Sequence, residues 1–213
     1  MTFIAILGWC GAVTSTFMLL PQAFALLRTR DTKGMSWPLW VVQIGTTVGW
    51  FMHGIKLGQA FMLMANTIAF TAVVIALIFL RRDKRLPTWW LVLPGLAFGA
   101  LLAVLDRAVG SAAFGATVVT PIAIAKLYQA VTIMRDTKVT GVSTTSWVVQ
   151  LANECIWLTW GLMYPDRGTI ISAIVSLTCN VTVLTILLLR LRGVGPFFPR
   201  RDEPAPEQIL AEF

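Results

Sequence analysis

The stretch Trp40-Val41-Val42-Gln43 recurs 107 residues later as Trp147-Val148-Val149-Gln150. When the comparison is extended in both directions, 13 of the 47 residues at positions 8–54 are identical to their counterparts at 115–161. The shared residues include Gln, Arg, Gly and Trp, which two unrelated apolar segments would not share in register. We infer that the chain contains an internal duplication.

The composition predicts that the duplicated chain lies in a membrane. Hydrophobic residues make up 57% of the 213 residues and charged residues only 13%, whereas a soluble domain carries about 25% charged residues. A spanning helix needs about 20 mainly apolar residues, and seven stretches qualify: 3–27, 37–56, 61–80, 89–105, 108–134, 146–164 and 169–189. We therefore predict an all-α, polytopic membrane protein with seven transmembrane helices, the first retained rather than cleaved as a signal sequence.

The basic residues predict how these helices are oriented. Thirteen Lys and Arg follow the first, third, fifth and seventh predicted spans, and only Lys56, Arg107 and Arg167 lie in the other connections. The positive-inside rule places the richer set in the cytoplasm. We expect a multi-pass protein of the plasma membrane with its N-terminus outside and its C-terminus in the cytoplasm. The net charge of +7 is thus a topology signal, and we expect no nucleic-acid partner.

Each copy of the duplication corresponds to three predicted helices. Three spans invert the chain, so one additional helix is needed before the second copy can run in the same direction. We predict a 3+1+3 arrangement of parallel three-helix repeats, with repeats at 1–83 and 108–192, a linker helix at 84–107 and a disordered cytoplasmic tail at 193–213. Transporters built from parallel repeats bind substrate near the bilayer midplane, between the repeats.

The stretch Leu20-Pro21-Gln22, followed by a basic connection and Gly34, resembles the PQ-loop signature of the SWEET and SemiSWEET sugar transporters and their relatives. The 3+1+3 arrangement is similar to that of full-length SWEET proteins. The resemblance covers residues 3–190 and implies a facilitative carrier of a small mono- or disaccharide that works by alternating access.

Proline near the end of a span predicts a hinge. Pro21 removes a backbone donor and crowds the preceding turn, which kinks a helix, and Gln22 can satisfy the freed backbone groups. The second copy has Tyr128-Gln129 instead, with Pro121 two turns earlier. We expect Pro21, Gln22, Pro121 and Gln129 to form hinges or gates, the alternative being static kinks.

Tryptophan and asparagine predict a solute site. The resemblance implies that Trp50 and Asn66, sixteen residues apart, line a sugar pocket, because an indole face packs on a pyranose and an amide both donates and accepts hydrogen bonds. The alternatives are an interfacial Trp and a packing Asn. The second copy has Trp157, but Ala173 stands at the asparagine position. The same site is predicted to include Thr14, Phe17, Thr46, Ile124, Asn153 and Asn180.

Ionisable residues within the predicted spans indicate an alternative function. Such residues are costly in a bilayer and usually face a cavity or a partner. Lys126 and Glu154 could pair across the second repeat, either as a structural ion pair or with Glu154 binding a proton or an ammonium or amide group of the substrate. The latter implies a proton-coupled carrier of an amino acid or another small polar metabolite. His53, near the outer end of its helix, is expected to be an ordinary exposed histidine.

Other functions are less compatible with the sequence. With one histidine and no phosphate-binding glycine loop, we expect no enzymatic activity, no cofactor and no metal site. A receptor or trafficking protein remains a third hypothesis, which the short connections disfavour. The expected partners are a small polar solute and the lipid bilayer, and a homo-oligomer is possible but not required.

Overall fold

The computed structural model describes residues 2–30, 32, 35–135, 143–195 and 197, without the side chains of residues 19, 21, 22 and 25. Over these residues the chain forms α-helices and no strand: α1 (Phe3–Thr29), α2 (Trp37–Leu57), α3 (Ala60–Lys84), α4 (Thr88–Ala108), α5 (Ser111–Arg135), α6 (Thr144–Met163) and α7 (Arg167–Leu191). The predicted all-α class is confirmed. The tail predicted at 193–213 lies outside the described residues except for 193–195 and 197.

Local signals set where the helices begin and end. The side-chain oxygens of Thr2, Ser143 and Asp166 accept backbone hydrogen bonds in the first turns of α1, α6 and α7, which satisfies donors that a helix leaves free. Pro38 lies in the first turn of α2, where its missing N–H costs nothing. Gly58 ends α2 in the left-handed conformation with φ of 66°, which glycine adopts without strain.

Several helices can cross a membrane by length and composition. Within the described residues these are α3, α4, α5 and α7, and the first part of α1, Phe3–Met18, is a shorter apolar segment. Large apolar side chains on these helices, such as Ile78, Leu93 and Val181, face outward, as the surface of a protein surrounded by lipid requires. The chain is therefore a multi-pass membrane protein.

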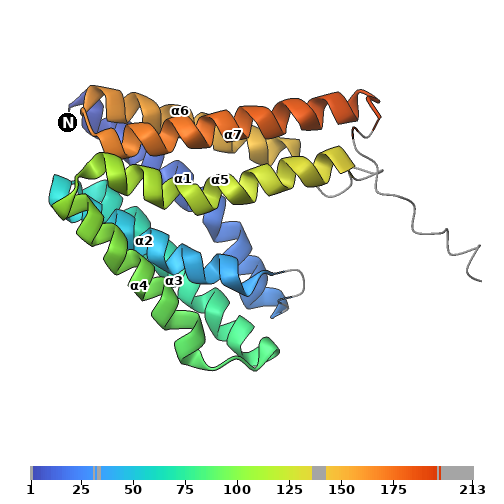
Figure 1. Cartoon of the computed structure of the whole chain (residues 1–213), viewed down its shortest axis with the longest axis horizontal. Coiled ribbons are helices and arrows are strands. Elements are labelled where there is room, and N and C mark those ends of the chain that lie inside the picture. The colour runs from blue at the N-terminus through green and yellow to red at the C-terminus, as the bar shows by residue number, and fades with distance from the viewer. Residues whose placement is uncertain (1, 31, 33–34, 136–142, 196, 198–213) are drawn as a thin grey trace, which may run out of the picture.

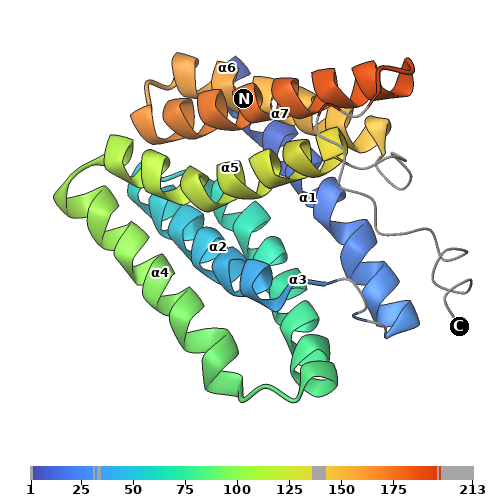
Figure 2. The ribbon, with the colours of Figure 1, turned by 45° about the vertical axis from the view of Figure 1, so that its right-hand side comes forward.

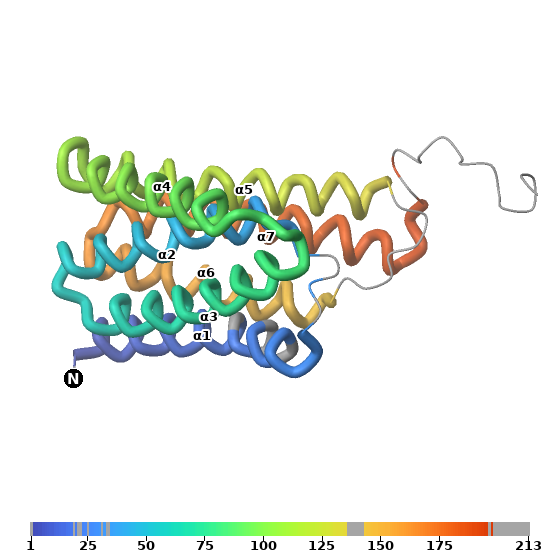
Figure 3. Tube along the Cα trace, turned by 90° about the horizontal axis from the view of Figure 1, so that it is seen from below, coloured from blue at the N-terminus to red at the C-terminus, as the bar shows by residue number. Residues whose placement is uncertain are grey.

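The helices form two halves that follow the duplication (Figure 1). In the first half α3 packs between α1 and α2, and in the second α7 packs between α5 and α6. The halves meet where α1 contacts α6 and where α2 contacts α5. These two contacts are equivalent, because α1 corresponds to α5 and α2 to α6 in the duplicated sequence. Seen from below, the helices are elongated in the same general direction (Figure 3).

Helix α4 is attached to the first half by a seam of glycines. A Cβ on Gly95 would lie 2.6 Å from the Val41 carbonyl oxygen, and one on Gly45 would lie 2.8 Å from the Gly95 oxygen. Gly49 and Gly99 continue the seam one turn further on α2 and α4. Small residues at this spacing let two membrane helices approach closely. The turn from α4 into α5 is short and contains Gly110 with φ of 122°.

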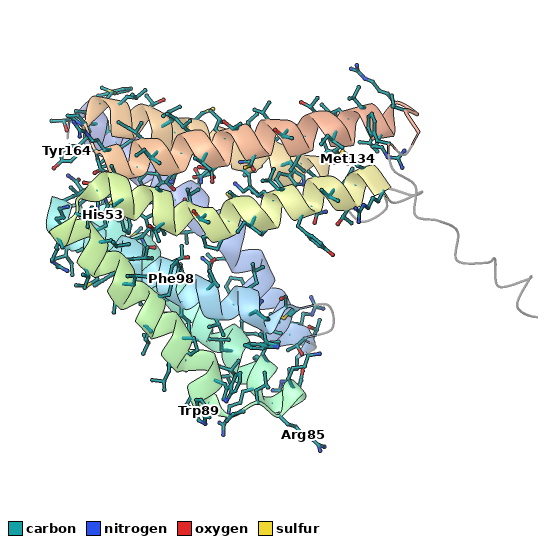
Figure 4. All side chains as sticks on the ribbon, in the orientation of Figure 1. His53, Arg85, Trp89, Phe98, Met134 and Tyr164 are labelled. Atoms are coloured by element: carbon teal, nitrogen blue, oxygen red, sulfur yellow. The ribbon has the colours of Figure 1, made fainter. Side chains whose placement is uncertain are left out.

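The two halves are close together at one end and diverge toward the other (Figures 1 and 2). The N-terminus and the α2–α3, α4–α5 and α6–α7 connections lie at the end where the halves meet. We call this the closed end, and the opposite one the open end. Figure 4 places His53 and Tyr164 at the closed end, and Arg85 and Trp89 at the open end of the first half.

Candidate functional site

A cavity of about 460 Å³ lies between the two halves. It takes side chains from all six repeat helices, and its lining includes no residue of α4. Its polar and tryptophan members are Ser15, Thr16, Gln43, Thr46, Thr47, Trp50, Asn66, Lys126, Gln150, Asn153, Glu154, Trp157, Thr169, Ser172 and Ser176. A hollow of this size, lined by both apolar and polar groups, is typical of small-molecule sites.

Five residues that the sequence predicted for the solute site come together in this cavity. They are Thr46, Trp50, Asn66, Asn153 and Trp157. They lie on α2, α3 and α6, so both halves contribute to the lining. The structure thus brings together the residues on which the predicted sugar pocket depends.

The wall from the first half consists of Trp50, Asn66 and two threonines. The Asn66 amide donates one hydrogen bond to the Met62 carbonyl, 2.8 Å away, and retains further donor and acceptor capacity. Thr46 donates to the Val42 carbonyl of its own helix at 3.1 Å. The Trp50 ring meets the Phe114 ring edge-on, with centroids 4.9 Å apart. Packing against α5 therefore fixes the orientation of the Trp50 indole.

A short hydrogen-bonded chain crosses from the first half to the second. The Trp157 indole N–H donates to the Ser15 hydroxyl at 3.1 Å, and that hydroxyl donates to Asn153 Oδ1 at 3.1 Å. Gly11 makes this approach possible, since a Cβ there would lie 2.9 Å from the Trp157 ring. The sequence did not lead us to predict Ser15. Its hydroxyl, one residue beyond the predicted Thr14, could have indicated that it lines the site.

Lys126 and Glu154, which the sequence suggested as a pair, lie next to each other in the structure. Their Nζ and Oε1 atoms are 3.4 Å apart, and the side chains are 10% and 19% exposed. The Lys126 ammonium also donates to the Ser176 hydroxyl at 3.2 Å. All three residues line the cavity, so the pair can meet a solute or water there as well as hold α5, α6 and α7 together.

Four other predicted site residues lie away from the cavity. Phe17 and Ile124 are 68% and 62% exposed, and the Thr14 hydroxyl bonds the Cys10 carbonyl of its own helix. Ser15 and Ile122 line the cavity instead, because each residue along a helix turns the side chain by about 100°. Asn180 is fully buried, and neither its amide oxygen nor its nitrogen has a partner among the described residues.

The predicted hinges are only partly visible. Helix α1 continues through positions 21 and 22, but the side chains of Pro21 and Gln22 lie outside the described residues. Pro121 lies inside α5 and borders a second, mainly apolar hollow with Val42 and Phe98. Gln129 is half-buried. Whether these positions bend during transport stays a prediction.

Aromatic side chains seal one side of the closed end. The Phe61 ring of α3 lies 6.1 Å from the Trp157 ring and 5.4 Å from the Trp160 ring of α6. The Trp160 ring stacks on Tyr164 at 5.0 Å, and the Tyr164 hydroxyl donates to the Leu57 carbonyl at 3.4 Å. These contacts join the two halves at the closed end, next to the cavity.

A buried charged cluster seals the other side, and here the sequence prediction was wrong. His53 is 0% exposed rather than on the surface. Its Nδ1 lies 2.9 Å from Asp106 Oδ2 of α4, and its Nε2 lies 3.0 Å from Asp166 Oδ2. Lys56 Nζ lies 2.8 Å from Asp106 Oδ1. The aspartates are 53 and 113 residues from His53 in sequence, so local pattern could not reveal them.

Asp166 lies in the connection between α6 and α7, and it is ionised at neutral pH. Burial raises the pKa of its carboxyl, but hydrogen bonds from His53 and from the Thr169 N–H outweigh burial and lower the pKa to about 2. Because the pKa falls on folding, this carboxylate stabilises the fold above its usual pKa of 3.8. That stabilisation is lost as the pH falls toward the lowered value.

Comparisons with known proteins point to transport. The chain is 29% identical over 87 residues to the sugar transporter SemiSWEET of Escherichia coli (strain UMEA 3162-1). The alignment covers 40% of this chain and 98% of that relative. No family model matches. The relative is therefore about as long as one half of this chain, and the similarity to a sugar transporter agrees with the resemblance found in the sequence.

Proposed function

We propose that this protein is a membrane carrier of a small sugar that works by alternating access between its two halves. The observation that carries this proposal is the cavity between equivalent helices, in which Trp50, Asn66 and Trp157 meet. Indole faces and amide groups suit the apolar faces and hydroxyls of a sugar. The similarity to a sugar transporter supports the same substrate class.

We further propose that all seven helices span the plasma membrane in the 3+1+3 arrangement. The repeats would be residues 1–83 and 108–192, with 84–107 as the linker. The open end carries the basic turns that end α1, α3, α5 and α7, so the positive-inside rule places that end in the cytoplasm. The N-terminus is then outside, and the cavity is closed toward the outside. One subunit could form a complete pathway, without an enzyme activity or a cofactor.

Counterflow of labelled sugars in proteoliposomes tests this function. We expect exchange without a pH gradient, and we expect Asn66→Ala to reduce it about tenfold, because an unpaired polar group costs about 1–3 kcal/mol. Thr67→Ala is the matched control, since Thr67 is exposed and bonds only the Leu63 carbonyl of its own helix. Equal loss in both variants, or no sugar exchange at all, would count against a sugar site at Asn66.

A proton-coupled carrier of an amino acid or other polar metabolite is the second candidate, and the ion pair in the cavity wall favours it. The same vesicles, given amino acids and an imposed pH gradient, discriminate the two candidates. Gradient-driven uptake that disappears in Glu154→Gln supports proton coupling. Because removing one partner of a buried pair destabilises a protein by about 3–5 kcal/mol, the double variant Lys126→Gln/Glu154→Gln shows whether the loss reflects folding.

A further inference from the structure

The charged cluster at the closed end joins three parts of the chain. His53 lies on α2, Asp106 at the end of α4 and Asp166 in the connection before α7. The contact between His53 and Asp106 stays within the first half and its attached helix, because α4 packs on α2. The contact between His53 Nε2 and Asp166 Oδ2, at 3.0 Å, connects the first half to the second. It therefore has to break if the halves separate at this end.

The geometry favours a proton on His53. A neutral imidazole has one N–H, whereas the imidazolium has two. Both ring nitrogens of His53 face carboxylate oxygens, at 2.9 and 3.0 Å, so only the imidazolium donates to both ionised partners. Protonation also balances the charge, since Lys56 and imidazolium offset the two carboxylates. Without that proton the buried cluster retains one negative charge, which is costly away from water.

Among the described residues around the cluster, Lys56 and a proton on His53 are what can offset the charge of the two aspartates. The ring of His53 stacks on the Phe114 ring of α5 at 4.6 Å, and the Trp50 ring meets it edge-on at 5.6 Å. The titratable and charged groups that face His53 or its partners are Asp106, Asp166 and Lys56. Among the described residues, His53 itself has no contact with a cation. The cluster also lacks an equivalent in the other copy, where Trp160 stands at the position of His53.

We propose that His53, Asp106 and Asp166 form a proton-binding site that holds the two halves together at the closed end while the proton is bound. The contacts determine in which direction pH changes the separation of the halves. The bonds to both aspartates exist below the pH at which His53 loses its proton, and one of them is lost above it. Alkaline pH therefore favours separation at the closed end, and acid pH favours closure. The effect on transport rests on the proposed function, whereas the protonation of His53 does not.

The protonation state can be observed directly, because His53 is the chain's single histidine. The whole protein, labelled with ¹⁵N-histidine and placed in lipid nanodiscs, gives ring signals that belong to His53 alone. We expect the imidazolium form at neutral pH, with loss of the proton as the pH is raised. A neutral imidazole throughout the accessible pH range would overturn the proposal.

Separation is measured in the same preparation by the distance between two spin labels. Ala60→Cys at the start of α3 and Arg167→Cys at the start of α7 place one exposed label on each half. The three native cysteines are replaced by alanine. Between about pH 5 and about pH 9 we expect the population of long distances to rise at least ~5-fold, as linked equilibria of this kind allow. A distance distribution that stays constant while His53 titrates would also overturn the proposal.

Two variants assign the effect to the cluster. His53→Gln, which does not titrate, should abolish the pH dependence of the distance. Asp83→Asn, which removes an exposed carboxylate paired with Arg82 at the other end of α3, should leave it unchanged. If His53→Gln does not fold, Asp106→Asn serves instead, because a neutral imidazole can then satisfy Asp166 alone and the pH dependence should shrink. Unaltered pH dependence in the folded cluster variant contradicts the proposal. A pH-dependent distance without any sugar exchange would sink the proposed function and leave the proton site standing.

Discussion

A single hydroxyl, that of Ser15, links the two halves within the cavity wall. It accepts from the Trp157 indole and donates to Asn153, so one small side chain of α1 positions two residues of α6. These two are among the residues expected to touch the solute. Through these two hydrogen bonds, the first half positions the part of the cavity wall that the second half contributes.

Replacing Ser15 tests this contact. Ser15→Ala leaves the Trp157 N–H and Asn153 Oδ1 without this partner, and we expect a loss of about 1–2 kcal/mol in stability, read as a lower melting temperature in detergent. Thr14→Ala is the control, since its hydroxyl bonds only the Cys10 carbonyl of α1. If the two variants melt at the same temperature, the bridge between the halves contributes nothing measurable.

At this scale the sequence predicted some contacts and missed others for identifiable reasons. The pairing of Lys126 with Glu154 was predictable, because two opposite charges in spans of one repeat have few other partners. The prediction for α1 was wrong by one residue, because Ser15 rather than Thr14 lines the cavity. His53 was predicted to be exposed because its partners come from distant segments, which only the packed helices bring together.

At the scale of elements, helix α4 is more than a connector. The sequence predicted the helix and its approximate bounds from its apolar length, and indicated only a linker between the two repeats. Its glycines at positions 95 and 99 pack against the backbone of α2 around Gly45. Glycine spacing could have indicated this seam, although which two helices share it depends on the fold.

Filling the seam should detach α4. In Gly95→Leu the new side chain meets the Val41 carbonyl oxygen and the Ile44 side chain at under 3 Å. Because backbone cannot yield as a side chain can, we expect a loss of about 1–3 kcal/mol or more, measured by thermal unfolding in detergent. Ala100→Leu, on the exposed face of the same helix, is the control. A stability for Gly95→Leu that matches the control would show that the seam is loose.

At the scale of the whole molecule, the duplication explains the paired contacts between the halves, and the differences between copies explain the closed end. Phe61, Trp157 and Trp160 seal the side where α1 meets α6, whereas His53 and its aspartates seal the side near α2 and α5. The repeat in sequence predicted two similar halves. It could not predict that one seal is apolar and the other charged, since this follows from unlike residues at equivalent positions.

The attachment of α4 to α2 has a consequence for how the protein could be assembled. If the seam is tight, the natural division of the chain falls after α4, at the short turn that contains Gly110. Two genes encoding residues 1–109 and 110–213 should then yield fragments that reassemble in the membrane, measured by co-purification through a tag on one fragment. A division at residue 87, before α4, would put α4 on a different fragment from α2, the helix it packs against. This division should yield less complex. Equal recovery from both divisions would show that α4 does not need to be on the same fragment as α2.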